Sequence, residues 1–241
     1  MSAVVAVGRR YLPRGWSDLG RQLAIWFGFA LLYQVARGFA DRNPTKAFSN
    51  GWEIVHLETR VTHRLYELTF QHFVDQKHWL ETLVSWTYWN SEFTVVGLAV
   101  LWVYLRRHDA FRSFRNSVLL ANLIGLVGYV FMPTAPPRLL GIGFVDQHRD
   151  GLVSLAANPY AAMPSLHCAD ALIVGVVLAC LCRSWIWRLV WAAWPAWVVF
   201  CVMATGNHFW LDCAAGVGVA ILSMGIVYNR RIRGAFAARP A

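Results

Sequence analysis

Long apolar runs constrain the fold of this chain more than any other feature. About six of them approach the ~20 residues that a helix needs to cross a bilayer. Only 15% of the 241 residues are charged, whereas charged residues make up about a quarter of a soluble domain. We therefore expect an all-α integral membrane protein, a six-transmembrane helical bundle that forms one membrane domain over residues 1–241. The expected spans are roughly 19–39, 82–105, 115–133, 164–183, 186–205 and 208–228.

Two N-terminal segments need a separate interpretation. The first apolar run follows Arg9, Arg10 and Arg14, but it is too long for a signal peptide and lacks a small-residue cleavage site, so we interpret it as the first span. Residues 43–78 mix apolar side chains with charged ones such as Glu58 and Glu67. This mixture predicts one or two amphipathic helices between spans one and two, lying along the membrane interface or packed over the bundle.

Arginines are concentrated in four segments of the chain. With six spans these segments share one face of the membrane, and the positive-inside rule makes that face, with both termini, cytoplasmic. The net charge of +9 is then a topology signal, and its division among short loops argues against a nucleic-acid partner. The segments are the N-terminal tail with Arg9, Arg10 and Arg14, the loop with Arg106, Arg107, Arg112 and Arg115, the loop with Arg183 and Arg188, and the C-terminal tail with Arg230, Arg231, Arg233 and Arg239.

Three short polar stretches lie at the ends of spans three to six, and this topology brings all of them to the opposite, non-cytoplasmic face. If the third stretch is helical, His208 and Asp212 lie one turn apart on one face, so that the carboxylate can orient the imidazole as a nucleophile or general base requires. Together the stretches supply a cation, a hydroxyl, two imidazoles and a carboxylate, which points to phosphoryl chemistry. They are Pro133-Thr134-Ala135-Pro136-Pro137-Arg138, Pro164-Ser165-Leu166-His167 and Gly206-Asn207-His208-Phe209-Trp210-Leu211-Asp212.

Each of these residues also has a purely structural interpretation. A single histidine at a span boundary is more often a structural hydrogen-bonding group than a catalyst, and Arg138 alone could extend to lipid headgroups. The prolines at 133, 136, 137 and 164 could simply end or begin helices. The joint placement of the three stretches on one face, which follows from charge alone, favours a functional site.

The three stretches resemble the signature motifs of the type 2 phosphatidic acid phosphatase superfamily. Pro164-Ser165-Leu166-His167 is similar to the second motif, and His208 followed by Asp212 is similar to the third. Within the superfamily, the chain resembles the branch of inositol phosphorylceramide synthases and their bacterial relatives, over roughly residues 115–228. The resemblance implies a six-helix, multi-pass enzyme of a bacterial cell membrane, with its active site on the extracytoplasmic side.

The resemblance also implies a mechanism that needs neither a metal nor another cofactor. His208 attacks phosphorus and forms a phosphohistidine, while Asp212 fixes the tautomer of the imidazole and supports its positive charge. His167 protonates the departing oxygen and then activates the acceptor, which is water or an alcohol. Arg138 and Ser165, with backbone N–H groups at a helix start, hold the phosphoryl oxygens of a lipid phosphate or phospholipid substrate.

The chain departs from the family pattern at three positions. Phe131 stands where family phosphatases usually have a lysine, Val202 where they have an arginine, and Leu139 where a proline follows the first-motif arginine. Because a phosphate monoester dianion needs more positive charge than a diester monoanion, the missing cations favour transfer of a phospholipid headgroup, such as inositol phosphate, to an alcohol. A polyprenyl or phosphatidyl phosphate monoester phosphatase is the alternative. It would draw a further cation from Arg37, Arg42 or Lys46.

Two acidic residues inside expected spans are candidates for supporting the site from behind its reacting groups, because ionisable groups are costly within a bilayer. Glu92 lies about ten residues into the second span, which is the weakest by hydropathy. It is either functional or a protonated or paired carboxyl that ties spans together. Asp170 lies one turn after His167, so it either orients that imidazole or pairs with a polar group such as Asn122.

Two other classes of function are compatible with the sequence. A metal-dependent hydrolase would use His167, His208 and Asp212 as two-histidine, one-carboxylate ligands, but the neighbouring arginine and the lack of further ligands count against it. The five cysteines lie in apolar segments without zinc-site spacing and are expected to be inert. A non-catalytic membrane scaffold or lipid carrier is the third class. The sequence does not indicate an oligomeric state.

Overall fold

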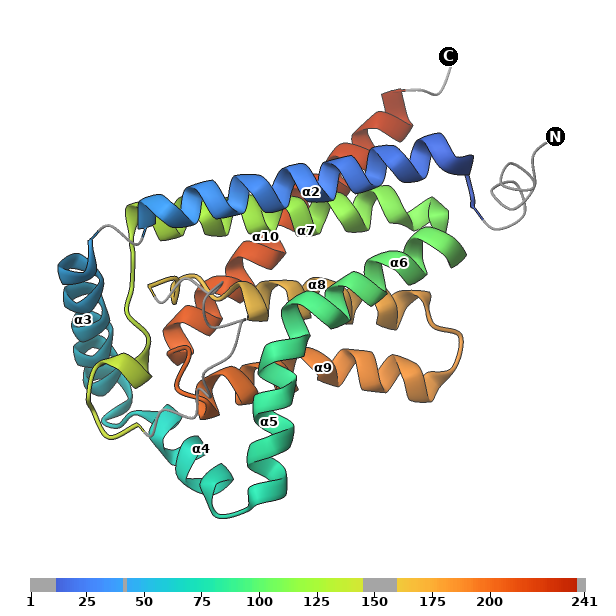
Figure 1. The fold of residues 1–241 in the computed structure, drawn as a ribbon. Coiled ribbons are helices and arrows are strands. Elements are labelled where there is room, and N and C mark those ends of the chain that lie inside the picture. Colours follow the sequence, from blue (N-terminus) through green and yellow to red (C-terminus); the bar gives the residue numbers. More distant parts are fainter. Residues whose placement is uncertain (1–11, 41–42, 145–159, 238–241) are drawn as a thin grey trace.

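The computed structural model describes residues 12–40, 43–144 and 160–237, which form a bundle of helices (Figure 1). Within these ranges there is no β-strand, only a single parallel bridge between Thr134 and Ala161. The all-α prediction is therefore confirmed. The elements are α2 (Gly15–Ala40), α3 (Pro44–Thr62), α4 (Tyr66–Asp75), α5 (His78–Asn90), the π-helix η1 (Ser91–Val95), α6 (Val96–Arg106), α7 (His108–Phe131), the 3-10 helix η2 (Pro137–Leu139), α8 (Leu166–Leu181), α9 (Trp185–Ala204) and α10 (Trp210–Ala237).

The long helices run back and forth between two ends of the bundle (Figure 1). At one end lie the start of α2, the junction of α6 and α7, the junction of α8 and α9, and the end of α10. The end of α7 and the starts of α8 and α10 lie at the opposite end, which we call the site end. The three polar stretches therefore gather at one end of the molecule, as the charge pattern predicts.

Three helices of the described chain are long and apolar enough to cross a membrane. They are His108–Phe131, Trp185–Ala204 and Trp210–Asn229, and α8 is a shorter apolar helix of 16 residues. The expected spans 19–39 and 82–105 coincide with α2 and with the continuous α5–η1–α6 helix. Three of the expected spans are thus candidate membrane-spanning helices, and the count of six stays a prediction.

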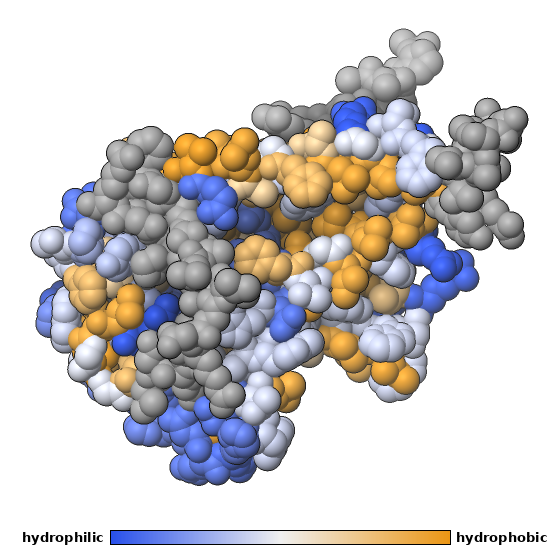
Figure 2. Space-filling model, in the orientation of Figure 1, coloured by the Kyte–Doolittle hydropathy of each residue, from blue (hydrophilic) through white to orange (hydrophobic). Residues whose placement is uncertain are grey.

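The outer surface of the bundle is apolar, as expected for contact with lipid. Phe27 on α2, Leu98 on α6 and Ile221 on α10 have 72%, 61% and 59% of their surface exposed. Figure 2 shows hydrophobic residues gathered over the part of the bundle around α2 and α6, with hydrophilic ones near α4. Such extensive apolar exposure is rare on soluble monomers and fits a membrane protein.

Residues 43–78 form two helices, α3 and α4, in agreement with the amphipathic prediction. The α3 helix begins where the side chain of Asn43 accepts a hydrogen bond from the Lys46 N–H at 3.0 Å, directly before a first-turn proline. Its buried face packs at the site end, where Ala47 and Ile54 join one apolar cluster with Ala135 and Phe209. That these helices lie along a membrane interface stays a prediction.

A π-helical turn interrupts the second expected span. Residues Ser91–Val95 form this turn between α5 and α6, and the helix bends there (Figure 1). It coincides with Asn90, Ser91 and Glu92, the polar residues that weaken the hydropathy of this span. Single π-helical turns within α-helices are frequent at functional sites, and this one carries Glu92 toward α8.

Candidate active site

His208 lies just before α10 and is held by a backbone carbonyl from the second polar stretch. Its ring nitrogen Nδ1 is 2.8 Å from the carbonyl oxygen of Ala162. A carbonyl oxygen can only accept a hydrogen bond, so Nδ1 carries the proton and Nε2 keeps its lone pair. The side chain is 5% exposed, and the residue lines the central cavity. His208 therefore presents an oriented nucleophilic nitrogen.

Asp212 supports His208 by charge and supports the backbone by hydrogen bonding. Its Oδ2 lies 3.7 Å from Nδ1 of His208 and accepts a hydrogen bond from the Phe209 N–H at 2.8 Å. The two side chains are near each other as predicted, although His208 precedes the helix instead of lying within it. The partner closest to the imidazole is the Ala162 carbonyl, which the sequence does not reveal. Asp212 is fully buried, so its carboxylate interacts with the ring through a medium of low polarity.

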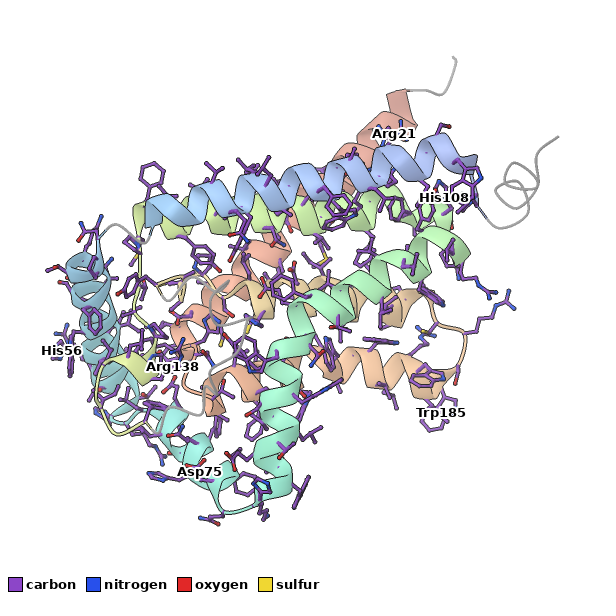
Figure 3. All side chains as sticks on the ribbon, viewed as in Figure 1. Arg21, His56, Asp75, His108, Arg138 and Trp185 are labelled. Carbon is purple, nitrogen blue, oxygen red and sulfur yellow. The ribbon has the colours of Figure 1, made fainter. Side chains whose placement is uncertain are left out.

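Arg138 is tied to the turn that carries His208. Its Nε donates to Oδ1 of Asn207 at 2.9 Å, and its backbone N–H donates to the Gly206 carbonyl at 3.0 Å. The amide of Asn207 in turn donates to Oγ1 of Thr205 at 2.8 Å. In Figure 3, Arg138 lies within the site end, whereas His108 and Trp185 mark the opposite end. Sequence reasoning assigned no role to Asn207, although it directly precedes His208.

His167 faces His208 and has a carboxylate partner from another helix. The two imidazole rings are 5.5 Å apart between centroids. Nε2 of His167 lies 3.2 Å from Oε2 of Glu92, and Tyr88 stacks on the ring at 4.6 Å. The imidazole is thus held between a carboxyl group on η1 and an aromatic face on α5. Tyr88 gave no signal in the sequence beyond its position one turn before Glu92.

The two acidic residues expected to support the site, Glu92 and Asp170, have different partners. Glu92 pairs with His167 and lines the cavity. Asp170 accepts two hydrogen bonds from the side-chain amide of Asn122, at 2.9 and 3.0 Å. Of the two alternatives for Asp170, pairing with Asn122 is therefore the one observed, and the carboxylate next to His167 is Glu92.

Ser165 caps α8 instead of lining the cavity. Its Oγ accepts a hydrogen bond from the Cys168 N–H at 3.4 Å, and the residue is fully buried. Its backbone N–H donates to the Asp212 carbonyl at 3.0 Å, which joins α8 to α10. The backbone of Gly216 packs against the Ser165 carbonyl, where an added Cβ would overlap it. The structure thus gives Ser165 a clear role in placing His167 relative to His208.

A cavity of about 500 Å³ joins these groups. Its lining includes Arg138, His167 and His208 together with the acidic residues Glu92 and Asp170. Among the residues that the structure describes, Arg138 is the only lysine or arginine in the lining. The remaining walls are largely aromatic or amide side chains, including Trp26, Phe29, Tyr33, Gln34, Trp89, Phe93, Asn122, Tyr129 and Asn207.

Among the described residues, the cavity lining has no further cation in place of the lysine and arginine that family phosphatases usually have at positions 131 and 202. Phe131 points outward with 72% of its surface exposed, and Val202 is fully buried. Lys46 donates to the Phe131 carbonyl at 3.1 Å and is absent from the cavity lining. Arg42 lies outside the described residues, as does the side chain of Arg37.

The metal-site alternative has no ligand set in the described part of the chain. There, no group of three or more histidine, cysteine, aspartate or glutamate side chains is arranged to hold a metal ion. Nδ1 of His208 is already used by the Ala162 carbonyl, and Oδ2 of Asp212 by the Phe209 N–H. The geometry instead brings two imidazoles and one guanidinium around a shared space.

Comparison with known proteins identifies the family. A model described as the PAP2 superfamily matches residues 52–226, which is more than two thirds of the chain. The chain belongs to the PAP2 superfamily. The match contains Arg138, His167 and His208, the residues that suggested the superfamily from the sequence. The narrower branch stays a prediction.

A solved structure supports the same PAP2 fold. The crystal structure of Aquifex aeolicus LpxE matches with a TM-score of 0.54 and 15% sequence identity, over 68% of this chain and 94% of that chain. At this identity the likeness concerns the fold. A comparison with curated proteins found no significant match.

Proposed function

We propose that this PAP2 protein is a membrane enzyme that cleaves a lipid phosphate ester through a phosphohistidine on His208. The observation that carries the proposal is the hydrogen bond from Nδ1 of His208 to the Ala162 carbonyl at 2.8 Å. It leaves a lone pair on Nε2 in a cavity that Arg138 and His167 also line. A neutral, oriented imidazole can attack phosphorus without first losing a proton.

In the first half-reaction, Nε2 of His208 attacks phosphorus, an N–P bond forms, and the bond from phosphorus to the departing oxygen breaks. The departing oxygen takes a proton from His167, whose imidazole is held by Glu92. Arg138 contacts the phosphoryl oxygens and offsets their charge. Asp212, 3.7 Å from Nδ1, stabilises the positive charge that the phosphorylated imidazole carries.

In the second half-reaction, a hydroxyl group attacks the phosphohistidine from the side of the departed oxygen. His167 removes its proton, a new O–P bond forms, the N–P bond breaks, and His208 returns to its neutral state. Water as the acceptor makes the enzyme a phosphatase, and an alcohol makes it a phosphotransferase. The chemistry of the protein side chains is the same in both cases, so the cavity decides the outcome.

The cavity favours a phosphodiester substrate and an alcohol acceptor. A single arginine in its lining matches the single charge of a diester better than the double charge of a monoester. Aromatic walls suit lipid chains, while the polar lining residues Glu92, Asp170 and Asn122 can bind hydroxyl groups. These features support our proposal that the protein acts as a headgroup transferase of the inositol phosphorylceramide synthase branch. A polyprenyl or phosphatidyl phosphate phosphatase is the alternative.

The charge pattern supports a site on the extracytoplasmic side of the membrane. The α6–α7 junction with Arg106 and Arg107 and the α8–α9 junction with Arg183 lie at the end of the bundle opposite the start of α10 (Figure 1). Positively charged loops stay preferentially in the cytoplasm. A lipid substrate would then reach the cavity from the outer leaflet.

The test is a substrate screen with the purified protein in lipid. It compares release of inorganic phosphate from polyprenyl and phosphatidyl phosphates with headgroup exchange between a phospholipid and an added alcohol. We expect exchange to exceed release, vanadate to inhibit, and activity to survive a strong chelator. Release without exchange would support the phosphatase alternative, and loss of activity in chelator would support the metal-dependent one.

The covalent step is tested by trapping a phosphate label on the protein. His208→Ala should abolish both the label and turnover. His56→Ala, which changes an exposed histidine on α3 (Figure 3), is the matched control and should change neither. A label that persists in His208→Ala would show that the nucleophile is another residue.

A further inference from the structure

Two buried glutamates from outside the sequence motifs hold the first turn of the helix that carries the site. Glu58 lies in the last turn but one of α3, and Glu67 lies in the first turn of α4. Both side chains are fully buried. Glutamate is rarely buried without a specific partner, so both positions need an explanation.

The partners of these glutamates are backbone N–H groups at the start of α10. Oε1 of Glu67 accepts from the Trp210 N–H at 2.7 Å, and Oε1 of Glu58 accepts from the Leu211 N–H at 2.9 Å. The preceding N–H, of Phe209, is taken by Asp212. A helix start has free N–H groups and a partial positive charge, so carboxylates there are stabilising. Three carboxyl groups from three helices thus cap α10.

The remaining carboxyl oxygens indicate that this cluster holds a proton. Oε2 of Glu58, Oε2 of Glu67 and Oδ1 of Asp212 are buried without a hydrogen-bond partner in the described structure. Unpartnered buried carboxylate oxygens are costly. Burial and the charge of Glu67 raise the pKa of Glu58 to about 9, and burial also raises the pKa of Glu67. The two carboxyl groups cap the adjacent N–H groups of Trp210 and Leu211, and one proton held between them at neutral pH would lower the cost of burying both.

We propose that Glu58 and Glu67 form a proton-sharing pair that positions His208 and Asp212 by capping α10. The inference rests on the proposed function only in that His208 is the nucleophile. The pair joins α3 and α4 to the site, and α3 also binds the Arg138 loop, because the Ala135 N–H donates to the Ala47 carbonyl at 2.9 Å. The segment between spans one and two therefore holds the start of α10 and the Arg138 loop in place.

The pair predicts a particular effect of alkaline pH. Below about pH 9 the shared proton lets both carboxyl groups face the helix start together. Above it both are ionised, they repel each other and Asp212, and the first turn of α10 loosens. Turnover should therefore fall as the pH rises through about 9. Asp212 and Cys213 on α10 are the other titratable groups that interact with the pair, whereas Arg60 on α3 and Arg64 in the turn before α4 are exposed.

The experiment uses Glu58→Gln, whose amide imitates the protonated carboxyl. The variant should keep kcat near neutral pH within about threefold, and it should lose the fall in kcat above pH 9. Glu58→Ala should lower kcat at least tenfold at neutral pH with little change in KM, because the cap is lost. Glu53→Gln, at an exposed glutamate of the same helix, and Cys213→Ala are the controls and should keep the wild-type pH profile.

A second measurement does not depend on activity. In the wild type, the folded state binds the Glu58 proton more strongly than the unfolded state does, so stability falls as the pH rises from about 5 to about 9. The Tm of Glu58→Gln minus that of the wild type should grow over this range and level off above it. If no lipid phosphate is turned over, the proposed function fails while this measurement still tests the pair. A constant Tm difference, or an unchanged alkaline fall in kcat, would overturn the proton-sharing proposal.

Discussion

A single methyl group at Gly216 should separate the two helices that carry the site histidines. Gly216 lies on α10, where an added Cβ would overlap the carbonyl oxygen of Ser165 and approach its carbonyl carbon to 3.1 Å. Backbone atoms cannot rotate away as a side chain does. Gly216→Ala therefore requires α8 and α10 to move apart by roughly 1 Å, which is enough to cost about 100-fold in rate when reacting groups are displaced.

The separation also strains the hydrogen bond from the Ser165 N–H to the Asp212 carbonyl, which is 3.0 Å long. Overpacking of this kind costs about 1–3 kcal/mol of stability. We expect Gly216→Ala to fold with a lowered Tm and to lose about 100-fold in kcat/KM in the phosphate-release or headgroup-exchange assay. The matched control is Gly218→Ala on the same helix, where an added Cβ meets nothing within 4 Å. Equal activity of the two variants would refute the reasoning.

Three further substitutions test individual contacts of the site in the same assays. Glu92→Gln replaces the carboxyl group that lies 3.2 Å from His167, and it should lower kcat about 100-fold or more and change the dependence of kcat on pH. An unchanged pH profile would show that Glu92 takes no part in the proton transfer. Asn207→Ala frees the Nε of Arg138 and should reduce kcat/KM about 10- to 100-fold, since a hydrogen bond to a charged group contributes about 1.5–3 kcal/mol. Asp212→Asn keeps an oxygen for the backbone but removes the charge near His208, so trapped phosphoryl label should fall; full labelling would contradict that role.

The pairing of His208 with Asp212 is the part of the site that sequence reasoning predicts best. The two residues are four positions apart and their side chains lie 3.7 Å from each other, although α10 begins only at Trp210, so the turn before the helix carries His208. The placement of Arg138, His167 and His208 at one end also follows from the sequence, because charge and span length limit how the chain can cross a membrane.

Pairings across helices could not be predicted in this way. The choice of Glu92 over Asp170 as the partner of His167 depends on the bend at η1, which turns one side chain of α5–α6 toward α8. Asp170 is nearer in sequence but faces Asn122 on α7. Asp170 could interact with His167 on its own helix or with Asn122 on α7, so its position in the sequence does not decide which partner it takes.

The sequence by itself thus determined the class of protein, the helical content, the PAP2 motifs and their convergence at one end of the bundle. These features depend on composition and on periodic, local geometry. Only the tertiary structure decided which groups surround the reacting atoms. The Ala162 carbonyl lies 46 residues from His208, and Glu67 and Glu58 lie 143 and 153 residues from the N–H groups that they cap. Such contacts depend on how helices pack together, because a buried polar group takes the partner that packing brings within reach.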